Sequence, residues 1–71
     1  MKNNQMQIDD FKIGDIVKHI DQDIWGTVLH IDYNCNDIVI NDLDSEYEYP
    51  DSELIYRPYE LKLSNQIKQE R

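Results

Sequence analysis

Short runs of β-branched and aromatic residues, separated by polar turns, fill the middle of the chain. Runs of about four to eight such residues are typical of β-strands. The pattern predicts five strands, over about residues 15–20, 26–32, 38–40, 46–49 and 54–57. Because turn residues recur between these runs roughly every 8 to 12 positions, we expect a small β-barrel or sandwich.

Residues 11–31 look like the organising stretch of this chain, with two strands joined by a polar loop. Gly26, at the start of the second strand, suits a position where another backbone comes close, because glycine has no Cβ. The strand over residues 46–49 alternates glutamates with tyrosines, and Pro50 is expected to end it.

The two ends of the chain have different patterns. Residues 1–10 are polar and amide-rich, which predicts a flexible arm with Ile8 as its one anchor. After Pro58, apolar residues recur every four positions at Tyr59, Leu63 and Ile67, which predicts a short helix over about residues 59–69. We therefore divide the chain into an arm (1–10), a barrel (11–57) and a C-terminal extension (58–71).

The length of 71 residues limits the chain to one small domain with a small core. A deep substrate cleft is not expected beside such a core, and no catalytic triad signature or glycine-rich phosphate loop occurs. Asp15 follows Gly14 and is expected to be a turn residue, and Cys35 has no basic neighbour in sequence to activate it. We expect a protein that is not an enzyme and takes no cofactor.

Metal binding and membrane insertion find no support in the sequence either. His19, His30 and Cys35 do not have the paired spacing of zinc ligands. The single cysteine fits a reducing compartment, and neither an export signal nor a stretch of about 20 apolar residues occurs. These features predict a cytoplasmic location.

Negative charge dominates the body of the chain. The formal net charge is −8, and residues 9–53 hold 13 acidic residues against only Lys12 and Lys18. Because proteins bind phosphate backbones by neutralising them with lysine and arginine, direct binding to nucleic acid is not expected.

Four short motifs together resemble the small SH3-like barrels of the Tudor and KOW type. They are Phe11-x-x-Gly14-Asp15-x-Val17-x-His19, Gly26-x-Val28-x-x-Ile31, Ile38-x-Ile40-x-Asp42 and Pro50-x-x-Glu53-Leu54. This group includes the Tudor-like C-terminal domains of UvrD-type helicases and RNA-polymerase-binding domains of the CarD type. The resemblance covers about residues 11–57 and implies an all-β, five-stranded SH3-like barrel. Eight side chains would then point inward: Phe11, Ile13, Val17, Val28, Ile31, Ile38, Ile40 and Leu54.

The first candidate site is an acidic run that alternates along the predicted fourth strand and the turn before it. Its members are Asp42, Asp44, Glu46 and Glu48, continued by Asp37, Asp51 and Glu53. Residues two apart in extended chain lie roughly 6.6 to 7 Å apart, similar to neighbouring phosphates on a nucleic-acid strand. The run therefore either imitates a phosphate backbone or is a solvated face that keeps a small protein soluble.

The second candidate site is aromatic, and its members are Trp25, Tyr33, Tyr47, Tyr49, Tyr56 and Tyr59. The rim of a Tudor-like barrel can hold such rings as a cage for a methylated cation, through cation–π attraction. Half-buried tyrosines that cover a core are the commoner arrangement, and core packing is the favoured interpretation of these rings. Trp25, at a junction of loop and strand, is the ring we expect to contact a partner.

These features favour a binding protein whose acidic face docks on a basic surface of a host nuclease, helicase or polymerase and inhibits or modulates it. Its size is similar to that of phage-type nucleic-acid mimics of the anti-restriction or anti-CRISPR class. The alternative is an adaptor or docking module for a transcription or repair complex, which binds through Trp25 or through an edge strand. The sequence leaves the oligomeric state open.

Overall fold

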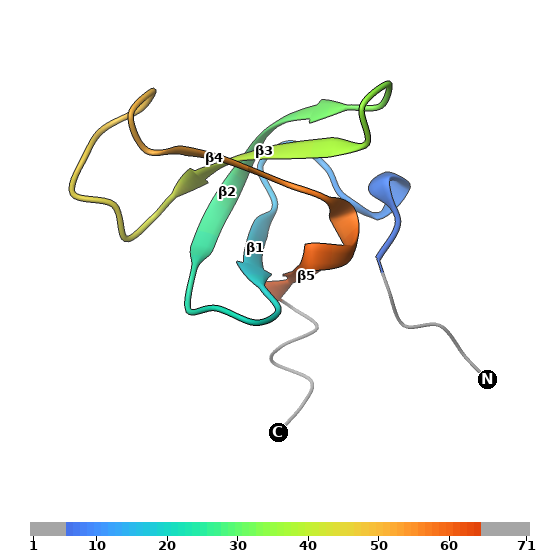
Figure 1. The fold of residues 1–71 in the computed structure, drawn as a ribbon, viewed down its shortest axis with the longest axis horizontal. Helices are drawn as coiled ribbons and strands as arrows, with labels where there is room; N and C mark the ends of the chain where they lie inside the picture. The colour runs from blue at the N-terminus through green and yellow to red at the C-terminus, as the bar shows by residue number, and fades with distance from the viewer. Residues whose placement is uncertain (1–5, 65–71) are drawn as a thin grey trace.

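Five antiparallel strands form one sheet in the computed structural model, which describes residues 6–64 (Figure 1). In chain order the elements are η1 (Ile8–Asp10), β1 (Ile16–His19), β2 (Trp25–Asp32), β3 (Asp37–Asp42), β4 (Glu53–Tyr56), η2 (Pro58–Glu60) and β5 (Leu61–Leu63). The strand order is β4-β3-β2-β1-β5, and η1 and η2 are 3₁₀ turns of three residues each. The protein is all-β, as the sequence predicts.

Burial alternates along β1, β2 and β3, so that side chains such as Val17, Val28 and Ile40 lie in the core. Val17 pairs with Gly26, and Val28 pairs with Ile40. The register between β2 and β3 then shifts between Val28 and His30. An extra residue in one strand reverses which face its side chains take. For this reason β2 buries Gly26 and Val28 before the shift and Ile31 after it.

The core consists of seven buried apolar side chains: Phe11, Val17, Val28, Ile31, Ile38, Ile40 and Leu61. Six of them are among the eight that the sequence predicts. Leu54 packs against this core but is only partly buried. The prediction for Ile13 is wrong, since its side chain is 68% exposed.

Ile13 is exposed because it lies within the turn from residue 12 to residue 15. Lys12 and Asp15 close this turn with two reciprocal hydrogen bonds. The Lys12 N–H donates to Asp15 Oδ2 at 2.8 Å, and the Asp15 N–H donates to the Lys12 carbonyl at 3.0 Å. Gly14, between them, has a φ of +98°, which favours glycine. The chain therefore turns before it enters β1, and Asp15 is the turn residue that the sequence predicts.

Gly26 of β2 lies close to the backbone of β3. A Cβ at this position would lie 2.9 Å from the carbonyl oxygen of Asn41 and 2.6 Å from Cδ1 of Ile40. Both distances are too short for non-bonded atoms, so only glycine fits without a shift of β3. The close backbone approach expected at Gly26 is confirmed.

The region after β4 differs from the prediction. The expected helix is wrong over Leu61–Leu63, which form β5 and pair with β1 through Val17↔Leu63 and His19↔Leu61. The remainder of that helix, from residue 65 onward, lies outside the described residues. Leu61 is buried because the neighbouring strand β1 supplies a partner that four-residue periodicity does not reveal.

At the other end, Met6 and Ile8 pack against the core. The Gln7 N–H donates to Asp10 Oδ2 at 2.8 Å and closes the turn η1. The anchor predicted at Ile8 is confirmed, and residues 1–5 of the predicted arm lie outside the described part of the chain.

Candidate functional site

Except for Asp37 at the start of β3, the acidic residues singled out from the sequence gather on the connection between β3 and β4, which we call the acidic loop (residues 42–53). It projects from the sheet at the left of Figure 1, at the end opposite the turn between β2 and β3. Asp42 is the last residue of β3 and Glu53 the first of β4. The predicted strand over residues 46–49 is wrong, because these residues form bends and a turn that pair with no strand.

The first half of the acidic loop is held by the end of β3. Oδ1 of Asp42 accepts a hydrogen bond from the Asp44 N–H at 3.0 Å, and the Asp42 carbonyl accepts one from the Ser45 N–H at 3.3 Å. Ser45 Oγ in turn accepts the Tyr47 N–H at 2.9 Å. Short polar side chains commonly close turns on their own backbone in this way. Asp42 therefore has a structural role that its neighbours Asp44 and Glu46 do not share.

The second half is held by a buried serine. Ser52 is only 3% exposed, and its hydroxyl donates to Oδ1 of Asn41 on β3. Its carbonyl accepts the Asp42 N–H at 3.0 Å, which ties the two ends of the loop together. Sequence reasoning missed Asn41 and Ser52. The short polar residues on both sides of the acidic run were the available signal for such turns.

Within the described part of the chain, no ion pair reaches the carboxylates of the acidic loop. Asp44, Glu46, Glu48, Asp51 and Glu53 are all exposed, and Asp42 is half-buried. The sequence has no lysine or arginine from residue 19 to residue 56. Among residues 6–64, the ion pair joins Arg57 Nε to Asp37 Oδ1 at 3.0 Å, outside this loop. The loop is therefore a concentrated negative surface.

Trp25 lies beside the base of the acidic loop. It begins β2 opposite Lys18 of β1, and its side chain is half-buried. Its carbonyl accepts the Leu43 N–H at 2.9 Å, so Trp25 is bonded directly to the first residue after β3. The structure thus brings together the acidic run and the tryptophan, two features predicted separately from the sequence.

The aromatic set as a whole is not brought together. Tyr33 lies in the turn between β2 and β3, whereas Tyr47 and Tyr49 lie on the acidic loop at the opposite end of β3 (Figure 1). These three rings are 63%, 67% and 59% exposed, so the expectation that they cover the core is wrong. They are too dispersed to form one cage.

Tyr56 behaves as the core interpretation predicts. Its ring packs edge to face against His19, with centroids 4.8 Å apart. Burial raises the pKa of Tyr56, and the negative charges of Glu60 and Asp42 raise it further. Nδ1 of the buried His19 accepts the Asp21 N–H at 3.0 Å, which assigns the imidazole a structural role.

The exposed thiol of Cys35 has surroundings that work against nucleophilic chemistry. It lies in the turn between β2 and β3, where Oδ1 of Asp32 accepts the backbone N–H groups of Asn34 and Cys35 at 3.1 Å. These two hydrogen bonds hold the pKa of Asp32 below its usual value, and the bond from the Cys35 N–H has the larger effect. The hydrogen bond and negative charge of Asp32 raise the pKa of the Cys35 thiol. The reactive thiolate is therefore disfavoured.

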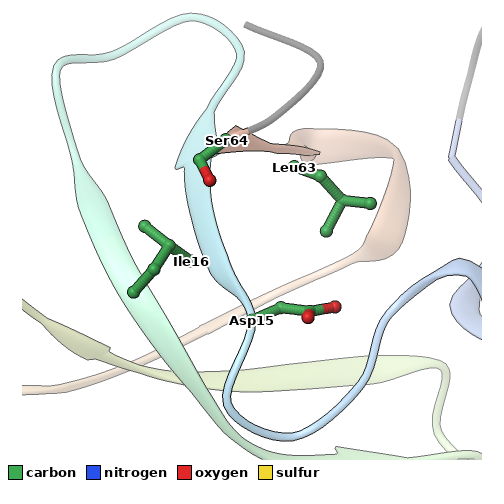
Figure 2. A pocket seen from close by; sticks show the side chains of 4 residues that line it. All are labelled: Asp15, Ile16, Leu63 and Ser64. Carbon is green, nitrogen blue, oxygen red and sulfur yellow. The ribbon is translucent and has the colours of Figure 1, made fainter. Parts of the chain in front are cut away.

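A shallow hollow of about 210 Å³ opens between β1 and β5. Figure 2 shows the four residues that line it: Asp15, Ile16, Leu63 and Ser64. The Asp15 carboxylate in this hollow accepts a hydrogen bond from the Lys12 N–H, which gives it a structural role in the turn. No group of three or more potential metal ligands occurs within the described range, and no described helix is long and apolar enough to cross a membrane.

Comparisons with known proteins return no relatives. No protein-family model matches the chain, and neither the curated proteins nor the solved structures contain a significant match.

Proposed function

We propose that this is a non-enzymatic cytoplasmic binding protein whose acidic loop docks on a basic surface of a nucleic-acid-handling protein and inhibits or modulates it. One observation carries the proposal. Five exposed carboxylates lie on one loop whose two ends are held by hydrogen bonds. The chain has no lysine or arginine from residue 19 to residue 56. A surface of one sign steers an oppositely charged partner toward it and raises the association rate.

The structure changes how such a loop would imitate nucleic acid. Regular phosphate-like spacing requires an extended strand, and residues 44–48 are not one. The resemblance to a nucleic acid is therefore one of charge density and not of repeat distance. Basic channels of restriction or CRISPR nucleases are partners of this kind, as are helicases and polymerases, and the proposed class remains that of anti-restriction or anti-CRISPR inhibitors.

The SH3-like fold of the Tudor type is part of the same proposal. The short connection between β4 and β5 supports it. These strands lie at the two edges of the sheet, and because only Arg57 and η2 join them, the two edges must lie near each other. Contact between His19 on β1 and Tyr56 on β4 also supports it, since it requires a strongly curled sheet. Fold alone does not assign function, so the functional argument rests on the acidic loop.

A second candidate function is an adaptor that docks through apolar contacts. Trp25 is half-exposed at the base of the acidic loop, and Ile55 on the edge strand β4 is 56% exposed. Such an adaptor would hold a transcription or repair complex through Trp25 or through the β4 edge, and its binding would resist salt.

Affinity capture from a bacterial lysate, washed at low and then at high salt, separates the two candidates. The test variant is D44K/E46K, whose side chains make no hydrogen bond within the described residues. The control is D21K/D23K, which changes the charge by the same amount in the exposed turn between β1 and β2. Asp42 stays unchanged because it closes a turn.

The acidic-loop proposal expects a nuclease, helicase or polymerase to be released by salt, to be lost with D44K/E46K and to be kept with D21K/D23K. Equal retention by both variants would reject it. A partner that survives the high-salt wash but is lost with Trp25→Ala would favour the adaptor.

A further inference from the structure

The strand β4 (Glu53–Tyr56) forms one edge of the sheet. It pairs with β3 on one side, and no other strand of residues 6–64 pairs with its second side, which we call the open edge. Glu53, Ile55 and Arg57 are exposed, and the extended backbone of Arg57 (φ −82°, ψ 155°) continues the line of the strand. The unpaired polar groups of an edge strand are a template for pairing with another chain.

The hydrogen bonds between β3 and β4 determine which residues face the open edge. Partners in an antiparallel pair alternate between positions that exchange both backbone hydrogen bonds and positions that exchange none. The Asp42 N–H donates to the Ser52 carbonyl at 3.0 Å, and bonded positions recur at every second residue from there. Leu54 and Tyr56 therefore turn their N–H and C=O groups toward β3, and Ile55 turns its own toward the open edge.

On either side of Ile55 the outward donors are already used. The Glu53 N–H donates to the Pro50 carbonyl at 3.1 Å, and the Arg57 N–H donates to Glu60 Oε1 at 2.8 Å. Within residues 6–64, the outward groups of Ile55 make no hydrogen bond. A strand that joins this edge can therefore exchange both backbone bonds only at Ile55, and this fixes its register.

We infer that two copies of this chain associate through their open β4 edges, antiparallel, with Ile55 of one copy opposite Ile55 of the other. This register places Glu53 of each copy opposite Arg57 of the other, so the strand is complementary in charge to itself. Opposite charges directly across a strand pair are stabilising. The arrangement has two-fold symmetry, the commonest symmetry of soluble oligomers. It goes beyond the function proposed above and needs no residue of the segment 44–51.

Arg57 can make this contact and keep its existing ion pair. Its Nε bonds Asp37 Oδ1 at 3.0 Å, and its side chain is 52% exposed. A guanidinium carries further N–H donors on its terminal nitrogens. A second carboxylate can therefore pair with the same side chain.

Apolar burial adds to the contact. Val39 on β3 is directly opposite Ile55 and half-buried, whereas the Ile55 side chain is 56% exposed. Residues directly opposite each other lie on the same face of a sheet. In the dimer, the Val39 and Ile55 side chains of both copies form one apolar row across four strands, and the burial of this row favours association.

The net charge of −8 on each copy opposes association, and the geometry limits this cost. The acidic loop leads into the start of β4, and η2 follows the other end of the strand (Figure 1). Because the paired strands run in opposite directions, the two acidic loops lie at opposite ends of the pair. Charges more than about 8 Å apart are largely screened at physiological salt, whereas Glu53 and Arg57 meet directly.

Sedimentation equilibrium of the full-length protein at physiological salt, up to millimolar protein, tests the inference. We expect the apparent mass to rise with concentration toward twice that of one chain. Ile55→Lys sets two lysines against each other and should weaken association by about tenfold or more. The matched control is Ile13→Lys, at a 68% exposed isoleucine in the turn before β1, and it should leave association unchanged.

Exchanging the charges gives a sharper test. Glu53→Lys or Arg57→Glu alone sets like charges against each other, and each should weaken self-association by about tenfold. In a mixed dimer of these two variants, the introduced lysine faces the introduced glutamate, and the remaining arginine faces the remaining glutamate. We expect the mixture to associate as well as the wild type, which damage to the fold could not produce.

A protein that stays monomeric at every concentration would overturn the inference and leave the open edge to the foreign strand of an adaptor. Association that Ile55→Lys does not weaken would place the contact elsewhere and would also overturn it, as would failure of the mixed charge variants to associate. The capture experiment with D44K/E46K decides the proposed function independently of these outcomes.

Discussion

His19 and Tyr56 pack their rings edge to face, with centroids 4.8 Å apart, although β2 and β3 separate their strands. In a flat sheet, strands three positions apart would lie roughly 14 Å from each other. The contact therefore requires the sheet to curl until the inner faces of β1 and β4 meet.

We predict that His19→Ala destabilises the fold by about 2–4 kcal/mol, because it removes a buried ring and leaves the Asp21 N–H without its acceptor. Tyr56→Phe keeps the ring contact and should cost less than about 1 kcal/mol. Urea unfolding of the two variants beside the wild type measures both values. A His19→Ala variant as stable as the wild type would show that the ring contact is incidental.

Gly26→Ala should destabilise the protein by about 1–3 kcal/mol, since the added Cβ meets Ile40 and the Asn41 carbonyl. Gly14→Ala is the comparison, because a Cβ there meets nothing within 4 Å and only its φ of +98° opposes alanine. Its expected cost of about 1 kcal/mol or more comes from backbone strain alone. Thermal unfolding reports both, and the circular dichroism of folded Gly26→Ala should reveal disturbed pairing of β2 and β3.

Asp42 should matter through its oxygen and not through its charge. Asp42→Asn keeps an acceptor for the Asp44 N–H and is expected to be nearly neutral. Asp42→Ala loses that acceptor, and we expect a cost of about 0.5–1.5 kcal/mol with faster amide exchange at Asp44. Chemical denaturation and hydrogen exchange test the pair. If both variants lose stability equally, the charge of Asp42 is what counts.

Cys35 should react slowly with alkylating reagents despite its exposure. The Asp32 carboxylate disfavours the negative thiolate and raises the pKa of Cys35 above its ordinary value of 9.0, so the reactive form appears only at higher pH. Asp32→Asn removes the negative charge and keeps an oxygen for the turn, so its profile of alkylation rate against pH should shift to lower pH. Iodoacetamide labelling followed by mass spectrometry measures this shift. An unchanged profile would mean that Asp32 does not control the thiol.

The strands β1, β2 and β3 are predictable because their sequence patterns agree with their environment. Each strand contains a run of β-branched residues, and Asn- and Asp-rich turns separate the runs. Six of the seven core residues are among the eight that the resemblance to a small barrel implies. Ile13 is not in the core, because hydrogen bonds between Lys12 and Asp15 turn the chain before the strand begins.

The fourth predicted strand and the predicted C-terminal helix show that a local sequence pattern does not specify which distant segment will pair with it. Residues 46–49 alternate well, but a strand also needs a neighbour, and this segment has none within the described residues. Leu63 lies at a helical spacing from Tyr59 and Ile67, but the edge of β1 pairs with Leu61–Leu63 as a strand. Tertiary pairing decides both cases.

The candidate site was only partly predictable. Its acidic residues and Trp25 are visible in the sequence, and the Leu43–Trp25 bond joins them in the structure. The extended geometry expected of the run is wrong because Asp42, Ser45 and Ser52 fold it into turns. Such side-chain bonds depend on where β3 ends, which the sequence pattern locates only approximately.

The pairing of β5 with β1 has a consequence for how this chain folds. Val17 pairs with Leu63 and His19 pairs with Leu61, so two strands that are far apart along the chain become neighbours only after a long loop has closed. Contacts between residues so distant in sequence slow folding, because the entropy of closure is lost before the contact forms. While the chain is being synthesised, β1 has an unpaired edge until residue 63 is available. Among the strands of residues 6–64, the last one to be made is thus the one that completes the sheet.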